Sequence, residues 1–314
     1  MNTEIPIFFA ADDNYIPCLA VAIQSLKDNA NNNTLYKLII LHSDMSENKT
    51  NEVMSFGTDN IKIELKNIAP TISKLEKDLD LRLRDYYSSA IYYRMFIPYL
   101  YPEYDKAIYL DSDIVLLDDI ENFYKTDLGT NLVGAIVDSV VKYTPVFHEY
   151  VLKNLGVEYT KYFNSGVLLM NLKEMRNSHL EDKFIKILTK YNCDSIAPDQ
   201  DYLNILCKDK VTYLPITWDK MPDFGDYIDE KELHLIHYNM FRKPWHYSDV
   251  PYSDVFWKYA KETNYYDILQ KDLDSYTDEQ KKNDLDGASL MQENSQRIIS
   301  LPDGKFIDII DTID

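Results

Sequence analysis

The stretch YLDSDIV, Tyr109 to Val115, ends an apolar run and places two carboxylates, Asp111 and Asp113, one residue apart. Side chains at positions i and i+2 of an extended backbone point to the same face, so the two charges lie close and repel each other. A divalent cation with oxygen ligands would remove that repulsion and keep positions open for phosphate oxygens. The stretch therefore predicts either a strand end followed by a solvated turn or a metal site at the edge of a sheet.

Predicted strands and helices alternate on both sides of this stretch. Such alternation indicates an α/β fold with a mostly parallel sheet and helices on both faces. In the first half the predicted strands are Ile5–Ala11, Leu35–His42, Ile61–Leu65, Lys106–Asp111 and Asn131–Asp138, and the predicted helices are Tyr15–Leu26, Ser46–Phe56 and Ser88–Tyr99. The second half predicts a strand at Tyr162–Leu172, helices at Leu180–Tyr191 and Ala197–Cys207, and short strands in VTYLP and LHLIHY.

Acidic residues gather where several of these predicted strands end. Because ligands of an open α/β sheet bind outside the carboxyl ends of its strands, this arrangement predicts a site there. Asp12 or Asp13 is also a candidate N-cap for the helix that follows. The acidic residues at the strand ends are Asp12, Asp13, Asp111, Asp113 and Asp138.

Length and composition limit the function classes. With 314 residues, of which 45% are hydrophobic, the chain can bury a large core, and its net charge of −19 disfavours nucleic acid and anionic membranes as partners. Three cysteines fit neither a disulfide framework nor a zinc motif, and we find no signal peptide and no membrane-length apolar run. We therefore expect a cytoplasmic protein with a main domain at 1–264 and an acidic, partly mobile appendage at 265–314.

The stretch IHYNMFRKPWH, Ile236 to His246, contains a histidine in an apolar strand and a lysine six residues later. A histidine in such a strand is usually a satisfied core group. His237 could instead complete a Mn²⁺ site with two carboxylates, and Lys243 could neutralise a phosphate as a point charge.

Three further polar positions have both a structural and a functional interpretation. At the start of a predicted helix, Asp199 suits an N-cap, while Asp199, Gln200 and Asp201 could bind the hydroxyls of a sugar. Asn164, in FNSG, has the same ambiguity. Arg94 lies in an otherwise apolar helix and is expected to have a carboxylate or phosphate partner.

Five motifs together resemble glycosyltransferase family 8, which includes bacterial lipopolysaccharide galactosyl- and glucosyltransferases and glycogenin. They are FFAADDNY, YLDSDIV, YFNSGVLLMNL, PDQDYLN and IHYNMFRKPWH, and they occur between about Ile5 and Trp245. The resemblance implies a GT-A fold with a single Rossmann-like sheet, a UDP-hexose donor, Mn²⁺ with Mg²⁺ as the alternative ion, and transfer that retains the anomeric configuration. It further implies a glycan or glycoconjugate acceptor.

The resemblance also assigns roles to individual residues. Asp111, Asp113 and His237 resemble the metal ligands of the family, and Lys243 resembles the residue that grips the diphosphate. Gln200 resembles the amide under the anomeric carbon, and Asp138 a carboxylate near the acceptor or the donor sugar. The residues that resemble donor-binding groups are Ala10, Asp12, Asn14 and Ser112 for the nucleoside and Arg94, Asn164 and Asp199 for the hexose.

Two features depart from the family pattern. Relatives often have a glycine three residues after the metal-binding histidine, where this chain has Met240, so a side chain is expected to enter the acceptor cleft. Lipopolysaccharide relatives often end in a basic, aromatic membrane-binding segment, whereas the tail here is acidic. We therefore do not expect membrane attachment through the tail.

Three alternative functions make different predictions. A haloacid-dehalogenase-like phosphatase would use Asp111 as its nucleophile, with GDYIDE (Gly225–Glu230) as the later acidic motif. A non-catalytic UDP-sugar-binding protein would bind UDP without turnover, an alternative that Met240 favours. A nucleotidyltransferase would have a basic, Gly-rich loop after the first strand, which AADDNY does not provide. The acceptor, the choice between glucose and galactose, and the oligomeric state stay open.

Overall fold

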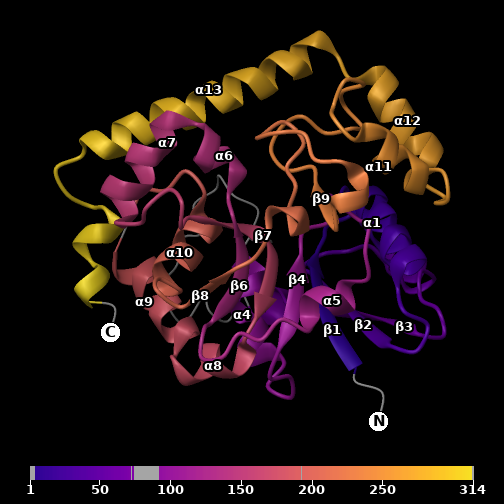
Figure 1. The fold of residues 1–314 in the computed structure, drawn as a ribbon, viewed down its shortest axis with the longest axis horizontal. Coiled ribbons are helices and arrows are strands. Elements are labelled where there is room, and N and C mark those ends of the chain that lie inside the picture. Colours follow the sequence, from indigo (N-terminus) through magenta and orange to yellow (C-terminus); the bar gives the residue numbers. More distant parts are fainter. Residues whose placement is uncertain (1–3, 72, 74–91, 192, 313–314) are drawn as a thin grey trace. The chain divides into compact units, whose positions relative to one another are not determined.

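In the computed structural model, residues 4–71, 73, 92–191 and 193–312 are described, and they form two compact units. Each unit consists of three separate stretches of the chain, which Figure 1 colours along the sequence. The first unit consists of Met1–Ala69, Ala107–Thr126 and Pro215–Asp286. The second unit consists of Pro70–Lys106, Asp127–Leu214 and Gly287–Asp314.

The first unit is built on a parallel sheet in the order β3-β2-β1-β4. Phe8 of the inner strand pairs with Ile39 on one side and Tyr109 on the other. Residues 5–9 are buried, which explains their continuous apolar sequence, because a strand covered on both faces has no polar side. The strands are β1 (Glu4–Ala10), β2 (Leu35–His42), β3 (Ile61–Asn67) and β4 (Ala107–Leu110).

A second, two-stranded sheet in the same unit joins distant parts of the sequence. Strand β5 (Ile114–Leu116) pairs antiparallel with β9 (Leu235–His237). Helix α1 (Ile16–Asn29) packs against β5 and against α11 (Ser253–Ala260). The other helices that lie wholly in this unit are α2 (Glu47–Met54), α5 (Ile120–Tyr124), α12 (Tyr266–Ser275) and the short 3-10 helices η3 (Ile216–Trp218) and η4 (Glu230–Glu232).

The second unit has a mixed sheet in the order β7-β6-β8. Strand β6 (Val133–Val137) pairs antiparallel with β7 (Phe163–Met170) and parallel with β8 (Val211–Tyr213), and its register with β7 shifts between Ala135 and Val137. Gly134 of β6 packs so closely that a Cβ there would lie 2.9 Å from Leu128. Around this sheet lie α4 (Tyr93–Leu100), α6 (Ser139–Tyr143), α7 (Pro145–Tyr150), the π-helix η2 (Val151–Leu155), α8 (Leu172–Asn177), α9 (Leu180–Lys190) and α10 (Pro198–Leu206).

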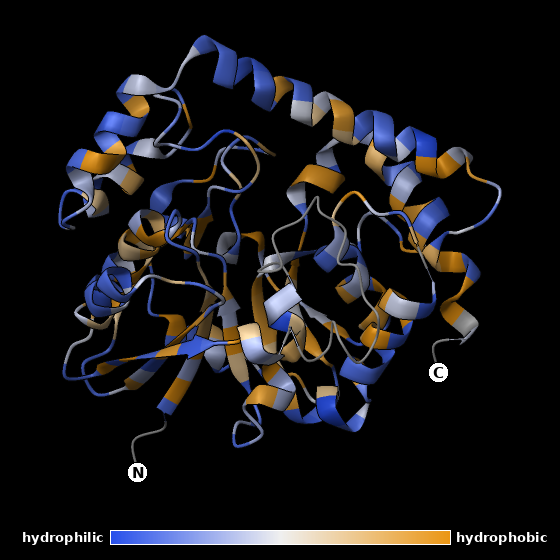
Figure 2. Ribbon diagram, turned by 180° about the vertical axis from the view of Figure 1, so that it is seen from behind, coloured by the Kyte–Doolittle hydropathy of each residue, from blue (hydrophilic) through white to orange (hydrophobic). Residues whose placement is uncertain are grey.

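The acidic tail is largely helical. Helix α13 (Asp278–Ser300) begins in the first unit and ends in the second, and η5 (Phe306–Asp308) and η6 (Ile310–Thr312) follow it. Figure 2 shows α13 as mostly hydrophilic with scattered hydrophobic residues. Phe306 is buried and packs edge to face on Tyr202 of α10, so the end of the tail contributes to the core of the second unit.

The prediction of an α/β fold with mostly parallel strands flanked by helices is confirmed. Of the helix predicted at Ser88–Tyr99, residues 88–91 lie outside the described part, and α4 covers the rest from Tyr93. The boundary at 264/265 stays a prediction. Among the described residues, no helix is both long and apolar enough to cross a membrane.

Candidate active site

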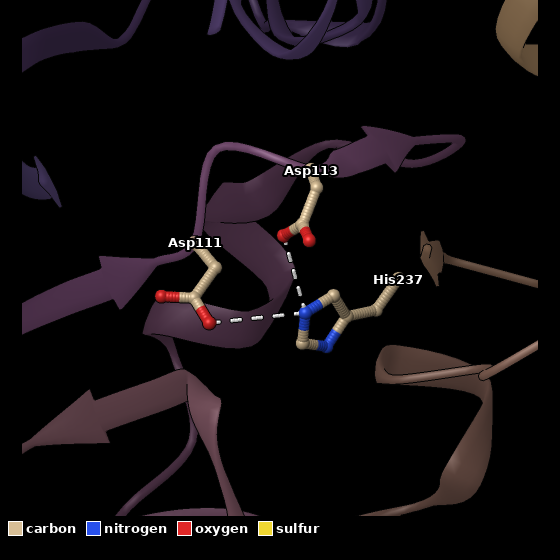
Figure 3. A group of neighbouring side chains, drawn as sticks. All are labelled: Asp111, Asp113 and His237. Atoms are coloured by element: carbon tan, nitrogen blue, oxygen red, sulfur yellow. Dashed lines mark ion pairs between the residues drawn. The ribbon is translucent and has the colours of Figure 1, made fainter. Parts of the chain in front are cut away.

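The two carboxylates of the opening stretch meet an imidazole in the first unit (Figure 3). Nε2 of His237 lies 3.4 Å from Oδ1 of Asp113 and 3.8 Å from Oδ2 of Asp111. One ligand atom from each of the three residues falls within 4.8 Å of the other two. We call these three residues the Asp–Asp–His cluster.

Sheet pairing explains why residues so far apart in sequence meet. Strand β4 ends at Leu110, the Asp-Ser-Asp turn follows, and β5 starts at Ile114. Antiparallel pairing of β5 with β9 places Ile114 opposite His237. The backbone N–H of Tyr238 also donates to the carbonyl of Asp113, at 2.9 Å. The pairing therefore brings the histidine to the turn that holds both carboxylates.

A third carboxylate holds the imidazole from behind. Nδ1 of His237 lies 2.9 Å from Oδ1 of Asp219, which is fully buried. A proton on Nδ1 that is donated to Asp219 leaves Nε2 facing the two other carboxylates, as in the carboxylate–histidine pairs behind many bound metals. Asp219 is not among the residues predicted from the sequence. Its segment, TWDKM, contains no sequence signal that would have indicated this role.

The charges around His237 fit a cation site. Burial acts to lower the pKa of His237, but Asp219 and Asp113 outweigh it and raise that pKa to about 10. The carboxylates thus attract positive charge to the ring. Two carboxylates and an imidazole also form a ligand set that suits Mn²⁺. The residues present therefore fit a divalent cation.

Lys243 lies beside the cluster and is buried. Its Nζ is 2.5 Å from Oδ2 of Asp113 and 2.6 Å from the carbonyl oxygen of Tyr238. Burial acts to raise the pKa of Asp113, but Lys243 and His237 outweigh it, so that pKa lies well below its usual range. Because Lys243 contacts Oδ2, the other oxygen of Asp113 stays on the side of His237.

The residues predicted for nucleoside binding lie where β1 and β4 end. Oγ of Ser112 donates to the carbonyl of Ala10, at 3.0 Å, and so ties the two strand ends together. Oδ1 of Asp12 accepts from the backbone N–H groups of Asn14 and Tyr15, at 2.9 and 3.1 Å. The prediction that Asp12 or Asp13 caps the following helix is wrong, because the N-cap position of α1 is Tyr15.

Met240 has a φ of +61°, in the left-handed region that favours glycine. The resemblance to the family predicts a glycine at this position. The chain thus adopts a conformation that favours glycine with a methionine.

In the second unit, Gln200 lies in a network of fixed hydrogen bonds. Its Nε2 donates to Oδ2 of Asp138 at 3.1 Å, and its Oε1 accepts from the backbone N–H of Ser165 at 3.0 Å. Asn164 donates to both Asp138 and Gln200, at 3.1 and 3.2 Å. Because the N–H of Ser165 can only donate, it determines which end of the Gln200 amide is the oxygen. The glutamine network (Asp138, Asn164, Ser165 and Gln200) therefore holds this amide in one orientation.

Arg94 has the carboxylate partner that its burial predicted. Its Nη1 lies 3.4 Å from Oδ2 of Asp199 and donates to the carbonyl of Ser165. The same carboxylate accepts from Oγ of Ser165, at 2.9 Å. Asp199 is not the N-cap that its position suggested, because Ala197 occupies that place in α10 and Asp199 lies in the first turn.

Asp201, one of the three polar residues at this helix start for which sugar binding was one interpretation, is held by hydroxyl groups of the protein instead. Its carboxylate is fully buried and accepts from the hydroxyls of Tyr150 and Tyr162, at 2.6 Å each, and of Ser195, at 2.5 Å. Burial raises the pKa of Asp201 to about 6, against the opposing effect of these hydrogen bonds. The carboxylate thus anchors the start of α10, one residue after Gln200.

The predicted site residues therefore form two groups, one in each unit. Those of the first unit are Ala10, Asp12, Asn14, Asp111, Ser112, Asp113, His237 and Lys243, and those of the second unit are Arg94, Asp138, Asn164, Asp199 and Gln200. The roles assigned to them stay predictions.

Comparison with known proteins places the chain among sugar-transferring enzymes. The model of glycosyl transferase family 8 matches residues 6–249. A putative glycosyltransferase of Haemophilus influenzae is 29% identical over 256 residues, which are 76% of this chain and 72% of that protein. The lipopolysaccharide 1,2-glucosyltransferase of Escherichia coli is 27% identical over 281 residues, or 84% of this chain and 80% of that enzyme.

Solved structures agree with the fold. The galactosyltransferase LgtC, crystallised with donor and acceptor sugar analogues, is 28% identical with a TM-score of 0.60 and matches 83% of this chain and 96% of its own. The bifunctional glycosyltransferase WbbM has a TM-score of 0.73 at 23% identity, over 88% of this chain. The match spans about half, 52%, of the WbbM chain. These likenesses confirm the predicted GT-A fold.

Proposed function

The chain belongs to glycosyl transferase family 8, and from that premise we propose that this glycosyltransferase moves a hexose from a UDP-sugar to a hydroxyl of a saccharide or glycoconjugate, retaining the anomeric configuration. The observation that carries the proposal is the Asp–Asp–His cluster, whose ligand atoms converge within 4.8 Å. Mn²⁺, or Mg²⁺ in its place, would be held by Asp111, Asp113 and His237. When bound, the ion supplies positive charge that stabilises the departing diphosphate.

The other polar residues of the first unit support the nucleotide half of the proposal. Lys243 would add its charge to the diphosphate, since its Nζ already lies beside Asp113. Ala10, Asp12, Asn14 and Ser112 would hold the nucleoside. Their hydrogen bonds fix the carboxyl ends of β1 and β4, where ligands of parallel sheets bind.

In the second unit, the glutamine network, together with Arg94 and Asp199, would bind the hexose. Retention requires either two inversions through a covalent intermediate or attack from the face of the leaving group. Both oxygens of Asp201 already accept tyrosine hydroxyls, and Asp201 is fully buried, which argues against it as a nucleophile. We therefore favour same-face attack, in which the departing phosphate oxygen takes the proton of the acceptor hydroxyl. Gln200 would stabilise the positive charge at the anomeric carbon, and Asp138 would hold Gln200.

Similar proteins support glucose or galactose as the transferred sugar. They include a lipopolysaccharide glucosyltransferase and a galactosyltransferase whose structure was solved with donor and acceptor sugar analogues. We propose the same two sugars for this chain, with a glycan as acceptor. A cytoplasmic location is part of the proposal and is supported by three cysteines that are all free and buried.

Met240 favours one alternative, a protein that binds a UDP-sugar without transferring it. Its side chain stands where the family pattern has glycine, on a backbone that needs a positive φ. Binding without turnover would follow if that side chain kept the acceptor out. Hydrolysis of the donor by water needs no acceptor, so binding of UDP with neither hydrolysis nor transfer would identify the non-catalytic protein, whereas release of UDP supports the transferase.

A hydrolysis screen tests the proposed function without knowledge of the acceptor. Purified full-length protein is incubated with UDP-glucose, UDP-galactose and, as a nucleotide control, ADP-glucose, each with Mn²⁺, Mg²⁺ or EDTA. We expect release of UDP from a UDP-hexose with Mn²⁺ and none with EDTA. Equal rates with EDTA, or cleavage of simple phosphomonoesters with a phosphorylated Asp111, would contradict the proposal.

A further inference from the structure

A groove of about 590 Å³ lies within the first unit, next to the Asp–Asp–His cluster. Its lining includes Asn14 and Tyr15, from the connection between β1 and α1, and also Lys243. The volume is that of a typical small-molecule site. The groove thus begins at the lysine that contacts Asp113 and continues along the residues that follow the first strand.

Residues of the tail form one wall of this groove. Tyr265, Ile268, Asp272, Tyr276 and Asp284 all line it. The family match ends at residue 249, so this wall is built by a segment that lies outside the match.

The wall is attached to the segment that contains the cluster histidine and Lys243. The ring of Tyr276 stacks on His246, with centroids 3.9 Å apart and planes 7° from parallel. The hydroxyls of Tyr276 and Tyr247 both donate to Oδ2 of Asp284, at 2.8 Å each. Near the other end of the wall, Lys49 donates to the hydroxyl of Tyr265, at 3.1 Å. These contacts hold the wall in a fixed position on the groove.

The polar residues of the groove suit the nucleoside of a nucleotide-sugar better than its hexose. A donor whose diphosphate lies at Lys243 has a nucleoside on one side and a hexose on the other. The residues proposed for the hexose all belong to the second unit, whereas every residue lining the groove belongs to the first. Asp13 and Asp272 also line the groove, and carboxylates repel phosphate but accept hydrogen bonds from ribose hydroxyls and base N–H groups.

We propose that Tyr265–Asp284 forms one wall of the pocket that holds the nucleoside of the donor. This inference rests on the proposed function and adds a part that the family match does not contain. Tyr276 and Asp284 are positioning residues of the wall, and Ile268, whose side chain is 47% exposed, faces the space that the nucleoside would fill. The tail is then a component of the donor site.

Filling the groove tests the inference. In the full-length protein, Ile268→Trp places a larger side chain in the groove at an exposed position. Leu290→Trp is the matched control, because Leu290 is 56% exposed on α13 and does not line the groove. Binding of UDP and of pyrophosphate, each with Mn²⁺, is measured by titration calorimetry. We expect Ile268→Trp to weaken UDP binding at least about tenfold while pyrophosphate binding changes less than about twofold, and the control to match wild type.

The outcomes separate this inference from the proposed function. If wild type binds neither ligand, both proposals fail. If wild type binds UDP and Ile268→Trp binds it equally well, the inference alone is overturned, and a raised KM for an acceptor without a change in UDP affinity overturns it in favour of an acceptor groove. Equal weakening of UDP and pyrophosphate also overturns it. If Ile268→Trp does not fold, Tyr276→Leu, which removes the stack on His246, is the second variant. We expect it to weaken UDP binding several-fold and to leave pyrophosphate binding nearly unchanged.

Discussion

In the first unit, Asp111, Asp113 and His237 turn their ligand atoms toward one another, whereas in the second unit Asp138, Asp199 and Asp201 are each held by hydrogen-bond donors of the protein. The first arrangement concentrates negative charge and raises the pKa of the imidazole to about 10. The second distributes its charge over amides, hydroxyls and one arginine. We infer from this contrast that the first unit is suited to bind a cation, whereas the carboxylates of the second unit fix neighbouring side chains in place.

The largest expected effect comes from removing a carboxylate of the Asp–Asp–His cluster. Asp113→Ala should lower metal-dependent hydrolysis of the donor at least about 10³-fold, because it removes both a proposed metal ligand and the partner of Lys243. Rates are measured with Mn²⁺ and with EDTA. Asp118→Ala, a nearby carboxylate outside the cluster, is the control and should keep near wild-type activity. Near-normal turnover of Asp113→Ala with EDTA present would show that the cluster is not a metal site.

The matching change in the second unit should act on rate more than on binding. Gln200→Ala removes the oriented amide, and we expect kcat to fall about 10²-fold while the donor KM changes less than about threefold. Steady-state kinetics of donor hydrolysis measures both constants. A large rise in KM with an unchanged kcat would mean that the amide only binds the substrate, and the contrast between the units would weaken.

The buried carboxylate of Asp201 gives a prediction for stability against pH. Its pKa is raised from 3.8 to about 6, so the folded state binds a proton more tightly than the unfolded state does. The resulting contribution, about 3 kcal/mol, is present below pH 4 and is lost as the pH rises through 6. Asp201→Asn lacks this titration. Unfolding free energies of wild type and variant are measured by urea denaturation from pH 4 to 8. As the pH rises, we expect the wild type to lose stability relative to Asp201→Asn. A difference independent of pH would contradict this account.

A smaller effect is expected behind the imidazole. Asp219→Ala should weaken Mn²⁺ binding about 10–100-fold, because it removes the group that orients His237. Asp219→Asn keeps an oxygen that can accept from Nδ1 of His237 and should therefore lose less Mn²⁺ affinity than Asp219→Ala. Mn²⁺ affinity is measured by electron paramagnetic resonance without nucleotide, so the readout does not depend on turnover. Equal affinity in wild type and Asp219→Ala would mean that the imidazole needs no such support.

The sequence predicted the first unit's site better than the second's, for a physical reason. Asp111 and Asp113 are separated by one residue and directly follow an apolar run. This local pattern is enough to predict a strand end with two carboxylates close together. The pairing of β5 with β9 brings His237 to these carboxylates, and both His237 and Lys243 were predicted from the segment IHYNMFRKPWH. Asp219 was missed because nothing near it in sequence shows that it will lie behind an imidazole.

In the second unit, the individual polar residues were predicted but their partners were not. Asp199 suggested a helix cap by its position, yet its contacts are with Ser165 and Arg94, which lie on other elements. The tyrosines that hold Asp201 lie about forty to fifty residues before it in the sequence. Contacts of this kind depend on how the chain folds back, and so does its passage between two units, which no composition change marks.

The most direct test of the account is a crystal structure of the full-length protein with Mn²⁺ and UDP, recorded with anomalous scattering from manganese. We expect one manganese peak bonded to carboxylate oxygens of Asp111 and Asp113, to Nε2 of His237 and to oxygens of the diphosphate. Bound UDP with a manganese peak elsewhere, or with none at these three residues, would contradict it.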